Sequence, residues 1–171
     1  MKLDQLTIKA QDALQDAQAL AQRRSQQRLE PEHLLLALLD QPDGLTAQLL
    51  EKAGVAQSRL RDLVEEALTR VPSVSGDTST HLSDRLNRLL LSAEEEAKRL
   101  TDAYVSTEHL VLAAFKDEAL ASAFRQVGLR RESIEAALKA LRGAHRVTDA
   151  NPEGQYRALE RYARDVTDLA R

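Results

Sequence analysis

The stretch Glu30-Pro31-Glu32-His33-Leu34-Leu35-Leu36-Ala37-Leu38-Leu39 decides the fold, because it returns 76 positions later as Ser106-Thr107-Glu108-His109-Leu110-Val111-Leu112-Ala113-Ala114-Phe115. Each stretch opens with a Glu-His step and continues as an apolar run too continuous to be one face of a surface helix. Each therefore predicts a buried central helix, and the recurrence predicts that the chain contains the same unit twice.

The repeat extends well beyond these stretches. Residues 6–39 align with 82–115 without a gap, and the same residue type recurs at ten positions of that window. Further along, the offset falls from 76 to 74 next to the turn at residues 42–44, after which Gly54 aligns with Gly128. The duplication predicts two units of the same fold.

Four helices are expected in each unit. In the first unit, apolar residues spaced by three and four predict a surface helix from Asp4 to about Arg24. A third helix, roughly Thr46 to Ala53, should stop at Gly54 in the left-handed conformation, as its counterpart should at Gly128. The predicted fold class is therefore all-α, an eight-helix bundle built from two four-helix repeats related by a pseudo-two-fold axis.

Composition shifts give the boundaries. We place repeat 1 at residues 1–71, a turn-rich linker at 72–81, repeat 2 at 82–142 and a second loose linker at 143–154. Residues 155–171 are amphipathic again but match neither repeat. We expect them to form a helix that does not join the core of the repeats.

The composition excludes several classes of protein. The 171 residues are 43 % hydrophobic with a net charge of −3, which is enough to bury one core. No apolar run has the roughly 18 to 20 residues of a membrane span, and the first residues do not resemble a signal peptide. Cys is absent, which fits a reducing compartment, so we expect a cytoplasmic location. Slight acidity and 3 % aromatic residues argue against nucleic-acid binding.

The motifs of nucleotide and metal chemistry are missing. None of the six glycines precedes Lys, so the chain has no phosphate-binding loop and we expect no ATP hydrolysis and no cofactor. The four His residues have no partner at the spacing that puts two metal ligands on one helix face, so no metal is expected. His33 and His109 are expected to be satisfied by backbone or by the other repeat. Glu32 and Glu108 lie near positive helix ends, where capping alone accounts for a carboxylate.

Two apolar residues lie outside the predicted buried stripes. Ile8 and Leu91 each fall on the opposite side of the first helix of a repeat, where they are expected to be exposed. Exposed apolar residues are common on protein surfaces, so an ordinary surface position was the favoured interpretation of each.

The two Glu-His-Leu repeats, with the opening Leu3-Asp4-Gln5-Leu6-Thr7-Ile8-Lys9-Ala10-Gln11-Asp12-Ala13-Leu14, resemble the amino-terminal domain of the Clp chaperones. Within that family the similarity is to ClpB, the ATP-dependent disaggregase. The stretch from Tyr156 to Ala170 looks like the segment that leads into the first AAA+ ATPase domain of that family. The resemblance therefore implies a fragment of a longer protein.

The resemblance implies a module that captures unfolded or aggregated polypeptide for a hexameric ring, which threads it with ATP and Mg²⁺ in cooperation with the DnaK chaperone system. The fragment itself is expected to be a monomer. By similarity, Thr7, Asp102 and Glu108 match positions implicated in substrate engagement, and Leu90 matches a leucine of the substrate groove. We expect the three polar residues to converge at the seam between the repeats as a polar rim, with Leu90, Ile8 and Leu91 as candidates for its apolar floor.

Three alternatives remain open from the sequence. An adaptor- or phosphoarginine-binding module, as in the related ClpC proteins, would use Glu32 and Glu108, but the Gly-Thr that precedes each Glu in ClpC is here Glu30-Pro31 and Ser106-Thr107. A bare structural spacer is the second alternative. An enzyme is the third and is disfavoured, because the sequence shows no nucleophile, metal set or phosphate loop.

Overall fold

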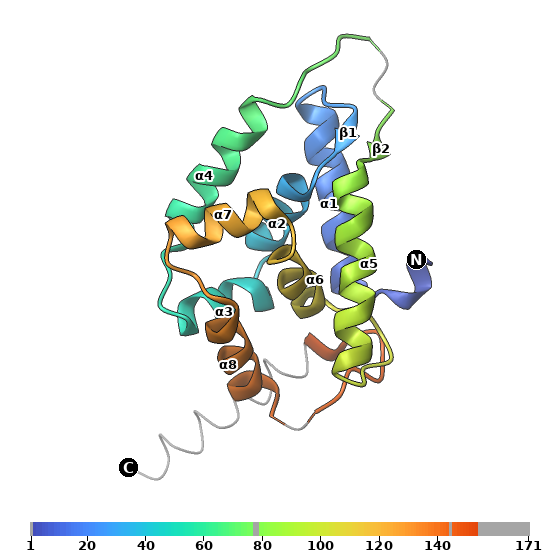
Figure 1. Ribbon diagram of the computed structural model, residues 1–171. Helices are drawn as coiled ribbons and strands as arrows, with labels where there is room; N and C mark the ends of the chain where they lie inside the picture. Colours follow the sequence, from blue (N-terminus) through green and yellow to red (C-terminus); the bar gives the residue numbers. More distant parts are fainter. Residues whose placement is uncertain (1, 77–78, 144, 154–171) are drawn as a thin grey trace.

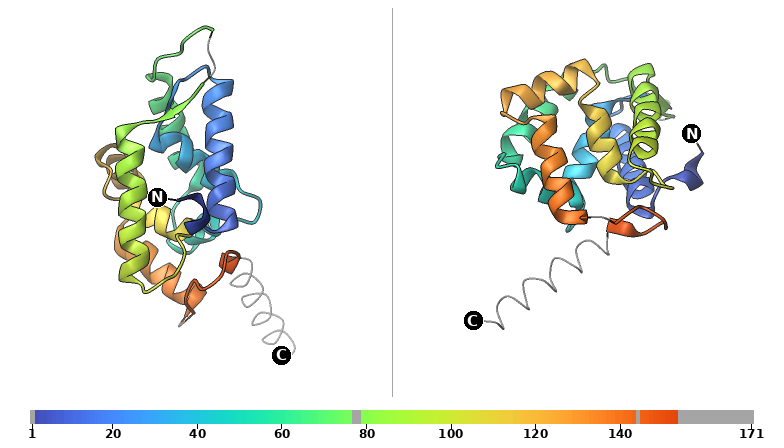
Figure 2. Two further views of the ribbon diagram at one scale, coloured as in Figure 1. Left: turned by 90° about the vertical axis from the view of Figure 1, so that its right-hand side faces the viewer. Right: turned by 60° about the horizontal axis from the view of Figure 1, so that its bottom comes forward.

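Two central helices lie between two outer layers (Figure 1). The computed structural model describes residues 2–76, 79–143 and 145–153. In Figure 1, α1 and α5 form one side of the molecule, α3, α4, α7 and α8 form the other, and α2 and α6 lie between them. The segment 145–153 follows α8 and runs back towards the start of α1, as both views of Figure 2 show.

Over the described residues the chain forms eight α-helices and two two-residue strands. The first repeat contains α1 (Ile8–Arg23), β1 (Arg28–Leu29), α2 (Pro31–Asp40), α3 (Leu45–Lys52) and α4 (Gln57–Thr69). The second contains β2 (His81–Leu82), α5 (Asp84–Arg99), α6 (Thr107–Ala114), α7 (Glu118–Gln126) and α8 (Arg131–Arg142). The predicted all-α fold with eight helices is confirmed.

Two helix boundaries differ from the sequence prediction. The first helix begins at Ile8 rather than Asp4, because Thr7 acts as its N-cap and a 3₁₀ turn occupies Leu3–Gln5. The third helix is shifted by one residue towards the amino terminus, because Gly44 is its N-cap and Ala53 its C-cap. Gly54 and Gly128 follow their helices with φ of 76° and 74°, the left-handed conformation expected of them.

The central helices are buried, as the continuous apolar runs predicted. Every residue from Pro31 to Leu39 of α2 is buried, and so is every residue of α6. The outer helices present one apolar stripe each, so α1 buries Ala10, Ala13, Ala17 and Ala21. Small alanines on this stripe allow α1 to pack closely on α2.

Backbone pairing between the repeats is made twice. Leu29 of β1 lies opposite Leu82 of β2 in a parallel register, and an isolated parallel bridge joins Leu6 to Val105. With the repeat offset of 76, Leu29 corresponds to Val105 and Leu6 to Leu82. The two pairings are therefore one contact repeated about a pseudo-two-fold axis, and each places the start of a central helix beside the start of the long helix of the other repeat.

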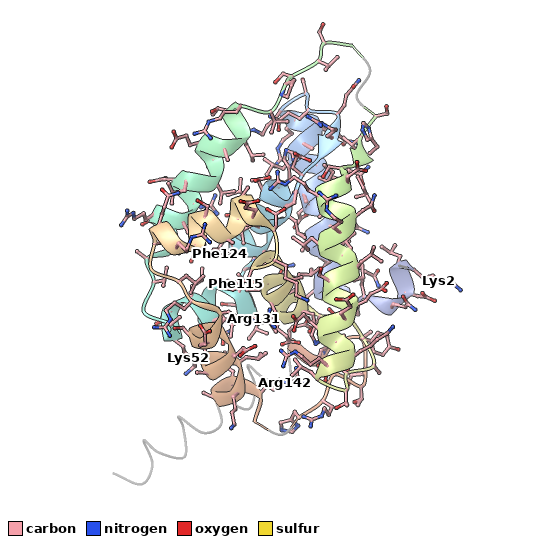
Figure 3. All side chains as sticks on the ribbon, viewed as in Figure 1. Lys2, Lys52, Phe115, Phe124, Arg131 and Arg142 are labelled. Carbon is pink, nitrogen blue, oxygen red and sulfur yellow. The ribbon has the colours of Figure 1, made fainter. Side chains whose placement is uncertain are left out.

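The remaining helices also interlock across the repeats. α3 packs on α8 and α4 packs on α7, which are equivalent contacts under the duplication. The rings of Phe115 and Phe124, labelled in Figure 3, lie with centroids 4.5 Å apart and contribute the aromatic part of this core. Among the described residues, no helix is long and apolar enough to cross a membrane.

Candidate functional site

The first turns of α2 and α6 are organised by histidines. Nδ1 of His33 accepts the backbone N–H of Glu30 (2.9 Å), and Nδ1 of His109 accepts that of Ser106 (2.8 Å). Each Nε2 therefore carries the proton and donates it, His33 to Gln26 Oε1 and His109 to Asp102 Oδ2, both at 2.7 Å. Burial lowers the pKa of His33 to about 4, so its ring is neutral at pH 7. The expectation that backbone groups satisfy these histidines is confirmed for Nδ1 of both rings, whereas Nε2 of each ring finds a side chain of its own repeat and not of the other.

We call the region where the start of α2 meets α5 the α2–α5 junction. Glu32 forms a two-pronged ion pair with Arg85, with N–O distances of 3.1 and 2.8 Å. The same guanidinium contacts Asp117 at 2.7 Å and Glu30 at 3.4 Å. Burial alone would lower the pKa of Arg85, but its hydrogen bonds to Asp117 and Glu32 outweigh burial and raise it. Glu32 is thus already bound to a guanidinium of its own chain.

The equivalent region, where the start of α6 meets α1, is the α1–α6 junction. Here Lys9 occupies the position that corresponds to Arg85. Among the described residues, Glu108 has no bidentate ion pair like the one between Glu32 and Arg85. Nη1 of Arg142 lies 4.0 Å from Glu108 Oε1, beyond hydrogen-bonding distance, while Ser106 Oγ donates to the same oxygen. Figure 3 labels Arg142 at the end of α8.

Glu108 lies in an unusual environment for a carboxyl group. It is 0 % exposed, and its Oε2 has no hydrogen-bond partner among the described residues. Burial, reinforced by the negative charge of Glu153, raises the pKa of Glu108 to about 8, although Arg142 acts in the opposite direction. Neither Glu32 nor Glu108 accepts a backbone N–H in the contacts the structure describes, because the capping role expected of them is filled by His33 and His109.

Asp102 is the best-satisfied carboxylate of this junction. It accepts hydrogen bonds from His109 Nε2, from Arg142 Nη2 and from the backbone N–H of Val147, the last at 2.9 Å. Burial alone would raise the pKa of Asp102, but the bonds from His109 and Arg142 outweigh it and lower the pKa to about 2. Asp102 is therefore ionised and fixed in place.

Thr7 serves two functions at the junction. Its Oγ1 accepts the backbone N–H of Ala10 at 3.2 Å, which caps α1, and donates to Glu153 Oε1 at 2.8 Å. The same carboxylate oxygen accepts the backbone N–H of Thr107, the first residue of α6, at 3.3 Å. A carboxylate of the second linker thus lies at the positive end of α6.

The segment 145–153 covers the junction. Its backbone carbonyls accept from the other elements: Val147 O from the N–H of Ala103 (2.7 Å) and Ala150 O from the N–H of Ile8 (2.8 Å). Val147, Pro152 and Glu153 are buried. The sequence predicted a loose linker here, and no period in the segment signalled that it would dock.

The predicted site residues are accordingly brought together and closed off. Thr7, Asp102 and Glu108 converge at the seam between the repeats. None of the three side chains is exposed, so they do not form the open rim that was expected. Leu90 is buried at 8 % exposure, whereas Ile8 and Leu91 are exposed at 51 % and 54 %. Leu3, at 57 %, is a further exposed apolar residue that sequence reasoning did not single out. Within the described ranges, no group of three or more His, Asp or Glu residues is arranged to hold a metal ion.

Comparison with known proteins defines the class of this domain. The sequence matches the family described as Clp repeat (R) N-terminal domain over residues 5–127, and the chain belongs to this family. What matches is an amino-terminal domain and not an ATPase domain.

The particular relatives are ClpB chaperones. The chain is 42 % identical over 169 residues to Chaperone protein ClpB 1 of Thermosynechococcus vestitus, covering 98 % of this chain and 19 % of the relative. It is 38 % identical over 172 residues to Chaperone protein ClpB of Porphyromonas gingivalis, covering 100 % of this chain and 20 % of the relative. The chain therefore spans about one fifth of the length of these relatives, and the resemblance inferred from the sequence is confirmed.

Solved structures agree with the fold. The Hsp104 N-terminal domain from Candida albicans superimposes with a TM-score of 0.77 at 23 % identity, covering 86 % of this chain and 98 % of that one. A ClpV N-domain solved in complex with a VipB peptide superimposes with a TM-score of 0.64 at 26 % identity, covering 80 % and 86 %. At 23 % identity, the similarity to the Hsp104 domain shows a shared fold alone.

Proposed function

We propose that this domain captures unfolded or aggregated polypeptide for an ATP-dependent disaggregase and does no chemistry itself. The observation that supports this most is the backbone hydrogen bonding of the α1–α6 junction. The N–H groups of Ile8 and Ala103 donate to the backbone carbonyls of Ala150 and Val147 in the second linker, which is a mode of binding independent of side-chain sequence. The ClpV N-domain, whose structure contains a VipB peptide, shows that a related domain accommodates a peptide ligand.

Exposed apolar residues would add affinity. Ile8 continues directly from Thr7 at the start of α1, and Leu91 lies on α5. Each exposes about half of its surface, so burial under a peptide would contribute about 1 kcal/mol per residue. Each contribution of this size changes Kd only about fivefold, so we expect the overall binding to be weak, about micromolar or poorer, as suits a module that must release its substrate.

The longer protein completes the proposal. We assign to that protein, as proposals, the binding of ATP and Mg²⁺, a hexameric ring and cooperation with the DnaK system in the cytoplasm. The described residues offer no phosphate loop for the nucleotide, since no glycine of the chain precedes Lys.

The phosphoarginine alternative is less well supported by the geometry. A phosphoarginine site of the ClpC kind would need Glu32 and Glu108 to receive the guanidinium of the ligand. Glu32 is already paired with Arg85, and Glu108 is fully buried.

Binding of a fluorescently labelled unfolded protein, such as reduced and carboxymethylated lactalbumin, tests the proposed function. Ile8→Ser and Leu91→Ser should each weaken binding about fivefold without changing the thermal midpoint, because both side chains are exposed. Val74→Ser, at a 41 % exposed position between the repeats, is the matched control and should bind like the wild type. Binding unchanged in both variants, or no binding by the wild type, would contradict the proposal.

A further inference from the structure

Four donors of the α1–α6 junction are satisfied by one segment. Val147 O, Ala150 O and Glu153 Oε1 accept in turn from Ala103 N, from Ile8 N, and from Thr7 Oγ1 together with Thr107 N. The acceptors are spaced by three residues along the segment. They therefore define how a bent peptide segment lies across this junction, with the side-chain carboxylate of Glu153 at the start of α6.

This carboxylate position exists in one repeat only. In repeat 1 the residue equivalent to Thr107 is Pro31, which has no backbone N–H to donate. The α2–α5 junction is instead neutralised from within by Arg85. Of the two junctions, only the α1–α6 junction therefore offers the first backbone N–H of its central helix to a carboxylate, and Glu153 occupies this position.

The resident carboxylate is held imperfectly. The negative charge of Glu153 lies close enough to the buried Glu108 to raise the pKa of Glu108, and the Oε2 atoms of both residues have no hydrogen-bond partner among the described residues. Most of the segment is in contact with solvent: His145, Arg146, Thr148, Asp149 and Asn151 are exposed. The segment is held by the buried side chains of Val147, Pro152 and Glu153, by backbone hydrogen bonds at Val147 and Ala150, and at the surface by a bond from Arg146 to Thr101. A peptide that makes the buried contacts and also satisfies the second carboxylate oxygen would replace it.

We propose that residues 147–153 are a tethered competitor that occupies the polypeptide-binding site of this domain until a substrate displaces them. The substrates favoured are peptides that adopt the same bent path and present an apolar residue and, six residues later, an acidic side chain, in the pattern of Val147 and Glu153. The inference rests on the proposed function, since it assigns the substrate class and the regulation of that site. It also accounts for the burial of Thr7, which lies in contact with the competitor rather than with solvent.

Removing the carboxylate of the competitor should open the site. The experiment measures binding of a fluorescein-labelled, carboxyl-terminally amidated peptide with the sequence of residues 145–153 to the 171-residue chain. Because a tethered segment competes at an effective concentration in the millimolar range, the wild type should bind this peptide weakly. Glu153→Ala in the protein should tighten binding about tenfold, and Glu153→Gln, which keeps an acceptor oxygen, by less.

Two controls test whether the gain depends on the glutamate of the peptide and on position 153 of the protein. The same peptide with alanine in place of its glutamate should show no gain on the Glu153→Ala protein, and Glu132→Ala, at an exposed acidic residue of α8, should leave binding unchanged. Thermal midpoints of all variants show that the domain stays folded. The expected gain, confined to the variants at Glu153, supports the competitor.

The outcomes separate the two proposals. Equal binding of the peptide to wild type and Glu153→Ala, or no binding to either, overturns the competitor, whatever the unfolded protein does. If unfolded lactalbumin fails to bind both proteins while the peptide shows the tenfold gain, the segment is a displaceable ligand and the proposed capture of unfolded polypeptide is wrong. Tightening of both ligands by Glu153→Ala supports both.

Discussion

Replacing Glu108 by Gln should stabilise the domain, and the gain should grow with pH. Glu108 is fully buried without a cation in hydrogen-bonding distance, and its pKa is raised from 4.5 to about 8. Because the folded state favours the protonated form, the stability that depends on this proton is complete below about pH 4.5 and is lost as the pH rises through 8. Gln mimics the protonated carboxyl at every pH.

The size of the effect follows from the shift. Between pH 5 and pH 7 the unfolded chain releases the proton of Glu108 while the folded protein largely keeps it. Linkage then lowers the free energy of unfolding of the wild type by about 2–3 kcal/mol relative to Glu108→Gln over this range. Other groups, including His33 and Asp102, titrate in both proteins and cancel in the difference.

Urea unfolding followed by circular dichroism at pH 5, 6, 7 and 8 measures this difference. Glu32→Gln is the matched control, since it removes the equivalent carboxylate where Arg85 neutralises it. That variant should lose about 1–2 kcal/mol at pH 7, because it leaves a partly buried guanidinium with one partner fewer. A pH-independent difference between Glu108→Gln and wild type would refute the reasoning, and so would a loss of stability at pH 8.

Two further predictions concern stability. Asp102→Asn should lose about 2 kcal/mol at pH 7, and the loss should shrink as the pH falls from 4 to 2, because the pKa of Asp102 is lowered to about 2 and its contribution disappears as it is protonated; acid unfolding curves of both proteins check this. Gly128→Ala should cost about 1 kcal/mol, because φ is +74° there and no atom outside its neighbours would meet the new Cβ, so backbone strain acts alone; the urea midpoint should fall without a change in slope.

The sequence predicted the helices well because their signals are local or repeated. The continuous apolar runs after Glu32-His33 and Glu108-His109 indicated buried helices, and the duplication fixed the order of the others. It also predicted that Thr7, Asp102 and Glu108 would converge, since the pseudo-two-fold axis brings the starts of α1 and α6 together.

The docking of residues 145–153 over Thr7, Asp102 and Glu108 could not be predicted in the same way. Residues 145–153 dock through one buried valine and through three hydrogen-bond acceptors, namely two backbone carbonyls and one carboxylate. The donors to these acceptors lie about 45 to 145 positions earlier in the chain. Such bonds leave no period in the sequence. The different fates of Glu32 and Glu108 were hidden for a similar reason, because they depend on Arg85 and Lys9, residues of the opposite repeat.

The doubled pairing of Leu6 with Val105 and Leu29 with Leu82 also bears on how the domain arose. A surface that meets its own copy about a two-fold axis is what a homodimer uses, so the two repeats contact each other as the subunits of a symmetric dimer would. In a homodimer, any substitution appears on both sides at once. Joining the two copies in one chain removed that constraint, and Arg85 opposite Lys9 and Pro31 opposite Thr107 are differences that only a fused pair can hold. The two junctions can therefore differ in charge and in backbone donors only because each half of the chain has its own sequence.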